Sequence, residues 1–291
     1  MQAVMVASTL AIISLILPPV SIVSSAAVAL VTLRRGAYEG VWVLLCASAA
    51  AALLGLLLVG GYQFALFYGL VLWLPVWVIS VILREGRYLS LAVEIAVLIG
   101  VLGVVFFYLY QEQPAALWQV VLTQMVKPML DSSPEVPVEN VRQSLAVFAH
   151  YMTGIIAAGS VYGMLFGLFL GRWWQAVLYN PGGFRREYLS LRTHWWLALA
   201  TLAVLAAAWL GSGSVSEIAW NVTILLFVLY TFIGAAVVHL LLAGLKSGRF
   251  WMPVFYVTLL LIPHAMAPVA LIGLSDAWLD LRNKFSKQTD A

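Results

Sequence analysis

The sequence predicts an all-α, polytopic transmembrane helix bundle. Of its 291 residues, 64% are hydrophobic and only 9% are charged, whereas soluble domains carry about 25% charged residues. Apolar runs of the roughly 18 residues needed to cross the hydrocarbon core recur along the whole chain, and basic residues gather in alternate turns between them. We therefore expect lipid to surround most of the side chains.

The first apolar segment, residues 3–33, is interrupted by Pro18 and Pro19. No Lys or Arg precedes it, so the basic region of a cleavable secretory signal is missing, and we expect the segment to be retained. Proline inside a helix removes a hydrogen bond and clashes with the preceding turn. The segment is therefore either one kinked span or two half-length helices.

Six longer apolar segments are expected to cross the membrane. They are residues 38–59, 63–82, 89–110, 144–171, 195–210 and 218–245. The turns between them are alternately basic and non-basic, as consecutive crossings require, and the positive-inside rule places the basic turns in the cytoplasm. We also expect a short cytoplasmic tail, 282–291. All Lys and Arg residues except Lys127 and Arg142 then lie inside, which is 13 of 15, as in a protein of the bacterial inner membrane.

Lys127 and Arg142 belong to the loop 111–143, which four carboxylates make acidic and which we place on the periplasmic side. Five apolar residues of this loop follow the spacing of one helix face. They are Trp118, Val121, Leu122, Met125 and Met129. This pattern predicts a short amphipathic helix that lies on the outer membrane surface or caps the bundle, with Pro128 expected to end or kink it.

The last apolar segment, residues 251–280, is broken by Pro263 and Pro268. We favour a hairpin there, because the basic residues before and after it are both expected inside. Broken membrane segments point to binding sites in transporters, but ordinary proline kinks between packed helices explain the pattern equally well. The whole of 1–281 is read as one transmembrane helical domain.

Glycine recurs at every fourth position of the segment 144–171. The four residues are Gly159, Gly163, Gly167 and Gly171. A stripe without side chains lets another helix approach closely. Packing inside the bundle is the expected use, and a homodimer face or a sliding surface for transport is the alternative.

The basic turn 172–194 has Trp pairs at both ends and a turn signal at its centre. Its residues of interest are Arg172, Trp173, Trp174, Asn180, Gly182, Gly183, Arg185, Arg186 and Arg192. Trp and Arg at this depth favour lipid headgroups, and the same groups could hold an anion or a partner protein. No Gly-Lys-Ser/Thr follows, so the turn is not a phosphate-binding P-loop.

Two motifs carry a resemblance to a known family. The stretch RWWQAVLYNPGGFRREYLSLR (172–192) and the ending GLSDAWLDLR (273–282) resemble the YybS-like family of uncharacterised bacterial membrane proteins. That family is thought distantly similar to the substrate-binding subunits of energy-coupling-factor vitamin transporters. The resemblance implies a helical bundle that binds a small molecule, although no ligand residue of those subunits can be matched in this sequence.

Ionisable residues inside a membrane are costly and are candidates for function. The candidates for ligand binding are Glu94, His150, His264, Asp276 and Asp280. Each has a structural alternative: Glu94 can extend to the membrane edge, each His can bond a backbone carbonyl, and the two Asp residues can pair with nearby basic residues.

The sequence contains no nucleophile beside a base, no metal-ligand spacing and no Gly-rich nucleotide loop. We therefore expect no cofactor, no metal and no catalytic residues. The leading hypothesis is a protein that binds or transports a small molecule. The alternatives are a scaffold or assembly factor that recruits a protein partner through the basic turn, and a membrane-embedded enzyme acting on lipid. The basic residues lie where membrane topology requires them, so nucleic acid is not an expected partner.

Overall fold

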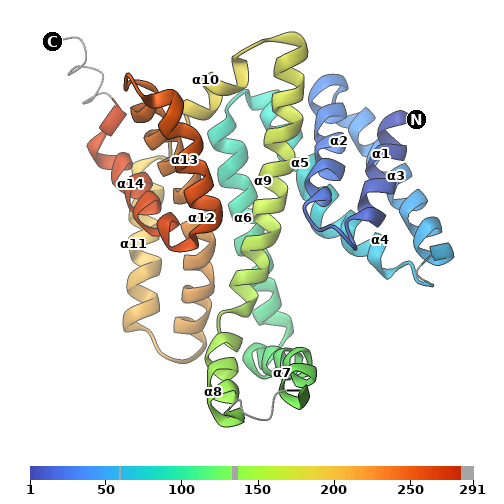
Figure 1. The fold of residues 1–291 in the computed structure, drawn as a ribbon, viewed down its shortest axis with the longest axis vertical. Helices are drawn as coiled ribbons and strands as arrows, with labels where there is room; N and C mark the ends of the chain where they lie inside the picture. The colour runs from blue at the N-terminus through green and yellow to red at the C-terminus, as the bar shows by residue number, and fades with distance from the viewer. Residues whose placement is uncertain (59, 133–136, 283–291) are drawn as a thin grey trace.

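The computed structural model describes residues 1–58, 60–132 and 137–282, and these residues form helices joined by short turns (Figure 1). No strand occurs in this part of the chain, so the predicted all-α helix bundle is confirmed. The elements are α1 Gln2–Ile13, α2 Val20–Arg35, α3 Ala37–Leu58, α4 Gln63–Phe67, the π-helical segment η1 Tyr68–Trp73, α5 Leu74–Gly86, α6 Leu89–Tyr110, α7 Pro114–Ser132, α8 Val138–Ala149, α9 Met152–Tyr179, α10 Gly183–Leu189, α11 Trp195–Leu210, α12 Gly213–Ala243, α13 Gly248–Leu261, the 3₁₀ turn η2 Pro263–Ala265 and α14 Met266–Leu279.

Five helices in the described ranges are long and apolar enough to cross a membrane: α3, the continuous rod Gln63–Gly86, α6, α9 and α12. Helix α11 is apolar but has only 16 residues. It coincides with the predicted short segment 195–210. Helices α13 and α14 bend by 115° at their break, so the second half does not continue the direction of the first. Part of the predicted tail, residues 283–291, lies outside the described residues.

One predicted span begins in the wrong place. Residues 144–149 belong to α8, and the crossing helix α9 starts only at Met152 and continues beyond 171 to Tyr179. Helix α8 mixes apolar residues with the polar run Arg142, Gln143 and Ser144, and its Val147 and Phe148 are exposed. A hydropathy window averages over all sides of a helix, so hydropathy alone does not separate α8 from the span α9 that follows it.

The amino-terminal segment forms two separate helices, which settles the alternative left open by its prolines. Helix α1 ends at Ile13, and α2 begins at Val20, just after Pro18 and Pro19. Ser24 Oγ on α2 donates a 2.7 Å hydrogen bond to the carbonyl of Ala7 on α1. Trp73, fully buried at the end of the π-helical segment, donates its ring N–H to the same Ser24 oxygen at 3.1 Å. This small cluster joins α1, α2 and η1.

Helices α6, α9 and α12 form the centre of the bundle. Their facing side chains, including Val97, Val161, Leu165 and Leu225, belong to the largest buried apolar cluster. Helix α12 is the most enclosed of the candidate spans, with two thirds of its most apolar window buried. A helix that is apolar on all sides is expected to be buried in this way.

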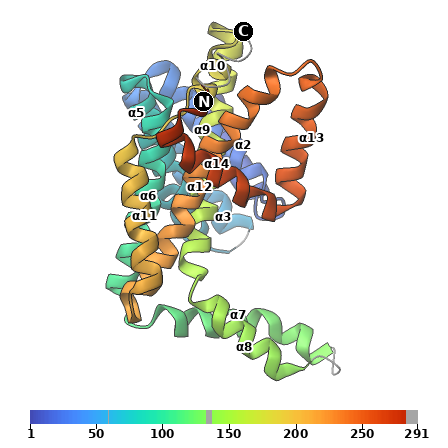
Figure 2. The same ribbon diagram turned by 90° about the vertical axis from the view of Figure 1, so that its left-hand side faces the viewer.

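Hydrogen bonds bring most of the basic turns together at one end of the bundle, called here the basic end. Arg84 Nη1, at the end of α5, donates to the carbonyl of Leu33 on α2 at 2.6 Å. The backbone N–H of Arg192 donates to Ser90 Oγ on α6 at 3.0 Å. At the other end of α9, helices α7 and α8 extend sideways from the bundle, as Figure 2 shows.

Candidate ligand-binding site

A cavity of about 900 Å³ lies between α9, α10, α12 and α13. Its volume is within the range that small-molecule sites occupy. Figure 2 shows α13 set off from the rest of the bundle, and Tyr256, Leu259 and Leu260 of this helix line the cavity. The side chains that line the cavity are mainly aromatic and aliphatic.

Aromatic rings form one wall of the cavity. Phe232 on α12 is the hub, because its ring centroid lies 5.6 Å from those of Tyr162 and Phe166 and 5.3 Å from that of Phe169, all on α9. Phe169 in turn lies 5.7 Å from Phe184 on α10. Edge-to-face and tilted pairs at these distances attract each other. The wall is therefore held in shape from three helices before any ligand binds.

Polar groups gather where the cavity meets α10. His239 Nδ1 lies 2.8 Å from the Tyr256 hydroxyl, while the other ring nitrogen, Nε2, is buried and has no hydrogen-bond partner in the described part of the chain. Arg185 and Tyr188 of α10 also line this region. Burial raises the pKa of the Tyr188 phenol well above its ordinary value, so this hydroxyl keeps its proton at neutral pH.

The cavity opens at the side of the bundle, between α9 and α13. Among its exposed lining residues, Val177 (53%) and Phe166 (43%) lie on α9 and Leu260 (78%) lies on α13. In a membrane this surface faces lipid. A ligand could therefore enter from the bilayer without passing through water.

The structure does not bring the predicted ligand-binding residues together in this cavity. Glu94 accepts a 2.9 Å hydrogen bond from Thr193 Oγ1, which ties α6 to the turn before α11. His264 is exposed in the turn η2. Neither residue lines the cavity, although Met266, two residues after His264, does.

His150 ends α8 and takes part in a polar network at the end of the bundle opposite the basic end. Its Nδ1 lies 3.0 Å from Glu217 Oε2 on α12, and Glu217 Oε1 accepts a 2.7 Å hydrogen bond from the Tyr108 hydroxyl on α6. Asn221, which is fully buried, donates to the His150 carbonyl at 2.7 Å and accepts from the Gly154 N–H at 2.5 Å. Glu217 and Asn221 were missed because neither has a motif around it.

Asp276 and Asp280 lie close to arginines. Asp276 is buried, and its Oδ2 lies 3.3 Å from Arg282 Nε, while Asp280 Oδ1 lies 3.3 Å from Arg192 Nη2. Arg282 also donates to the carbonyls of Leu189 and the following turn residue Leu191. These contacts join the end of α14 to the end of α10. Asp276 and Asp280 therefore stabilise the packing of these two helices.

The four glycines of α9 do not share one environment, and a Cβ on Gly163 would lie 3.4 Å from Leu72 Cδ1. A Cβ on Gly167 would lie 2.7 Å from Ser25 Cβ, and one on Gly171 would lie 2.8 Å from Ala29 Cβ, so α2 packs tightly against this half of the stripe. A Cβ on Gly159 would meet nothing within 4 Å. A closer approach that the sequence did not signal joins α12 to α14, where a Cβ on Gly234 would overlap the Val269 carbonyl.

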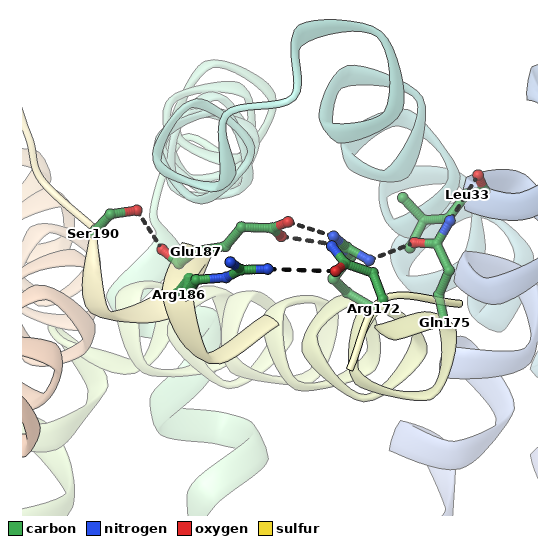
Figure 3. Close-up of polar contacts among 7 residues, drawn as sticks. Leu33, Arg172, Gln175, Arg186, Glu187 and Ser190 are labelled. Carbon is green, nitrogen blue, oxygen red and sulfur yellow. Dashed lines mark hydrogen bonds and ion pairs between the residues drawn. The ribbon is translucent and has the colours of Figure 1, made fainter. Parts of the chain in front are cut away.

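The basic turn folds into α10, and Gly182 begins it in the left-handed region at φ 78°. Arg172 pairs with Glu187 through two hydrogen bonds, one of 2.8 Å from Nε (Figure 3). Arg186 Nη2 donates to Asn180 Oδ1 at 3.4 Å. The turn thus holds its own shape by contacts between its two sides. The Trp195 and Trp196 rings stack at 3.7 Å, and Trp173 lines the cavity beside Gly182.

Part of the chain matches a known protein family. Residues 124–277, just over half of the chain, match the family model described as predicted membrane protein (DUF2232). The chain belongs to the DUF2232 family. No curated protein and no solved structure matches the chain. Every residue that lines the cavity, except Ile22 on α2, lies within the part that matches the DUF2232 model, so the cavity belongs to the portion of the fold that defines the family.

Groups of three or more His, Cys, Asp or Glu side chains with metal-site geometry do not occur among the residues described. Cys46, on α3, is exposed and free. The cavity of this DUF2232 protein is mainly apolar, and the Arg185 guanidinium and the side chains of Tyr188 and His239 supply charge and hydrogen-bonding groups beside α10.

Proposed function

We propose that this membrane protein binds an amphipathic molecule, with an anionic head and a long apolar body, in the cavity between α9, α10, α12 and α13. The cavity itself, lined mainly by aromatic and aliphatic side chains and with Arg185, Tyr188 and His239 together beside α10, is the observation that carries the proposal. Its polar end matches the charge and hydrogen-bonding needs of a carboxylate or phosphate head. Its aromatic and aliphatic lining suits the apolar surface of an acyl or prenyl chain.

The head, rather than the chain, supplies the selectivity. A lipid chain gains little from leaving the bilayer for an apolar cavity, because both surroundings are equally apolar. An anionic oxygen does gain, because Arg185 can donate to it and makes no ion pair or hydrogen bond within the described residues. The unpartnered Nε2 of His239 offers a second position for such a bond. Charge-assisted hydrogen bonds of this kind are the strong ones.

We further propose that the basic end faces the cytoplasm of a bacterial cell and that the ligand enters sideways from the inner leaflet. The positive-inside rule supports this orientation, and the position of Arg185 near the basic end supports the entry from that leaflet. A relation to the substrate-binding subunits of energy-coupling-factor transporters would fit a ligand held in the bundle. The proposal concerns binding, and transport would be a later step that moves the bound molecule across the membrane.

Photolabelling with a diazirine-bearing fatty acid tests the proposal. The protein is labelled in lipid nanodiscs and the modified peptides are identified by mass spectrometry. We expect labels concentrated on α9 and α13 around Phe166 and Leu260. The R185Q variant should lose most of this labelling, because a single charge-assisted contact to the head contributes about 1.5–3 kcal/mol, or roughly a tenfold change or more in affinity.

Two matched controls sharpen the result. Arg186 is the neighbour of Arg185 on α10 and is also exposed, but it does not line the cavity, so R186Q should label like the wild type. Leu260→Trp, which narrows the opening, should reduce labelling, whereas Leu271→Trp changes an equally apolar exposed leucine of α14 outside the lining and should not. Labels spread evenly over all lipid-facing helices, unchanged in R185Q, would contradict the proposal.

The same pair of arginines separates ligand binding from partner recruitment. If the basic turn recruits a protein, the outward Arg186 should matter at least as much as Arg185. A pull-down in which R186Q loses a constant partner while photolabelling stays unchanged would favour recruitment over ligand binding.

A further inference from the structure

A second pocket, of about 250 Å³, lies at the basic end between α2, α5, α9 and α10. It shares no lining residue with the cavity described above. Apart from Leu33 and Leu83, its lining is polar and consists of Arg84, Arg87, Arg172, Gln175 and Glu187. Helix α10 contributes to both spaces, through Glu187 to this pocket and through Arg185 to the cavity.

The lining of this pocket carries an excess of positive charge. Three guanidinium groups face one carboxylate, so the lining has a net charge of 3 minus 1, or +2. Arg84 also lies 3.6 Å from the carboxylate of Glu85, but Glu85 is largely exposed and is not part of the lining. Uncompensated positive charge in a recess concentrates anions.

Two of the three guanidinium groups are fixed in position before anything binds. Arg172 is held by Glu187 and by Gln175 Oε1, which accepts from its Nη1 at 2.9 Å (Figure 3). Gln175 Nε2 in turn donates to the Leu33 carbonyl at 3.2 Å. Arg84 donates to this same carbonyl at 2.6 Å. The carbonyl of Leu33 thus anchors one wall of the pocket.

Arg87 is the group left for a ligand. It follows α5 in the left-handed region at φ 58°, which directs the chain into the turn before α6. Its side chain is exposed, and no ion pair or hydrogen bond of its guanidinium occurs in the part of the chain that the structure describes. An unpaired guanidinium beside two oriented ones is suited to the oxygens of a tetrahedral anion.

We propose that this pocket binds a phosphate group through Arg84, Arg87 and Arg172. A phosphate dianion balances the charge of +2, and it presents enough oxygens for donors from the end of α5 and from α9. The phosphate belongs either to inorganic phosphate or to the head of an anionic lipid such as phosphatidate, since the pocket lies where the helices end. This inference uses other residues than the proposed amphiphile site and does not depend on it.

Thermal unfolding distinguishes the two sources. In the first arm, protein in neutral detergent is heated with increasing sodium phosphate, and sodium chloride at matched ionic strength serves as the reference. In the second arm, nanodiscs of phosphatidylcholine are compared with nanodiscs that also contain phosphatidate. We expect a saturable rise in Tm in at least one arm, and the arm that responds identifies the source.

Variants assign the response to the pocket. R87Q should weaken the phosphate or phosphatidate response by about tenfold in midpoint concentration. R35Q removes an exposed arginine at the end of α2, outside the pocket lining, and should respond like the wild type. E187Q removes the competing negative charge but keeps a side-chain oxygen that can accept from Arg172, so it should respond at lower concentration than the wild type. The proposal is overturned if neither arm raises Tm, if R87Q and R35Q respond alike, or if E187Q loses the response as R87Q does.

Discussion

Asn221 holds more hydrogen bonds between helices than its neighbours on α12. Its amide group contacts the Tyr108 hydroxyl at 3.0 Å, the His150 carbonyl at 2.7 Å and the Gly154 N–H at 2.5 Å. It thereby joins α12 to α6, to the end of α8 and to the start of α9. Because the side chain is fully buried, water cannot replace these bonds.

We expect N221A to lower the free energy of unfolding by about 2 kcal/mol, because buried partners left without a hydrogen bond each cost about 1–3 kcal/mol and membrane settings reduce that cost. Unfolding by SDS titration measures the difference. Asn140→Ala, at an exposed position of α8, is the control and should change stability little. Equal stability of both variants would show that the network contributes nothing.

Gly234 and Gly273 allow α12 and α14 to touch backbone to backbone. A Cβ on Gly234 would overlap the Val269 carbonyl, and one on Gly273 would overlap the Tyr230 carbonyl. Backbone atoms of two packed helices cannot move aside as the end of a flexible side chain can.

G234A should therefore destabilise the protein by about 1–3 kcal/mol, the usual cost of overpacking. Gly159→Ala adds the same methyl group on α9 where nothing lies within 4 Å, and alanine favours a helix over glycine. The same SDS titration should find it neutral or slightly stabilising. A G234A protein as stable as G159A would mean that α14 does not pack against α12 as described.

The sequence predicted the glycine stripe of α9, half of which packs against α2, but it did not predict the contact between Gly234 on α12 and Gly273 on α14. The stripe on α9 repeats every fourth residue, so its shared face can be found by counting. Gly234 and Gly273 stand alone on their own helices. Their pairing depends on how α14 folds back, which spacing along the chain does not contain.

At the scale of elements, α7 and α8 form an amphipathic pair whose apolar residues are largely uncovered. Met125 is 72% exposed, Val120 58% and Met129 51%. The pair stays attached to α9 through the Trp118 ring N–H, which donates to Thr153 Oγ1 at 2.9 Å. Of the two outcomes predicted for Pro128, an end or a kink, the end is excluded, because Pro128 lies inside α7 and the helix continues to Ser132.

We predict that α7 lies in the membrane interface with Met125 toward the acyl chains. Spin labels at M125C and at T123C, each in a Cys46→Ala background, report depth through their accessibility to oxygen and to a water-soluble nickel complex. The label at 125 should be more accessible to oxygen, and the label at 123 to nickel. The reverse order, or equal accessibility at both positions, would place α7 in water.

For the whole molecule, composition and hydropathy were enough to predict the helix bundle, because the bilayer requires long apolar helices. The sequence could not predict the cavity. Its wall combines Phe232 on α12, Phe169 on α9 and Phe184 on α10. The sequence does not distinguish an aromatic residue that lines a cavity from one that faces lipid, because both lie in apolar helices. The candidates chosen by charge, such as Glu94 and His264, lie outside it.

The orientation of the whole bundle is open to a direct test. Ser247 lies in the turn between α12 and α13, and Gln119 lies on α7 near the other end; both are exposed. With Cys46 replaced by Ala, a membrane-impermeant maleimide should label Q119C in intact cells, and S247C only after the inner membrane is permeabilised. The opposite pattern would invert the proposed topology.

The central claim is that an amphipathic molecule occupies the cavity between α9, α10, α12 and α13. An experimental density map of the protein purified in lipid nanodiscs tests this most directly. We predict elongated non-protein density along Phe232, with its head beside Arg185 and His239, and its absence in Leu260→Trp. A cavity filled by repacked side chains, or density equally weak there and along the outer lipid-facing surfaces, would contradict the claim.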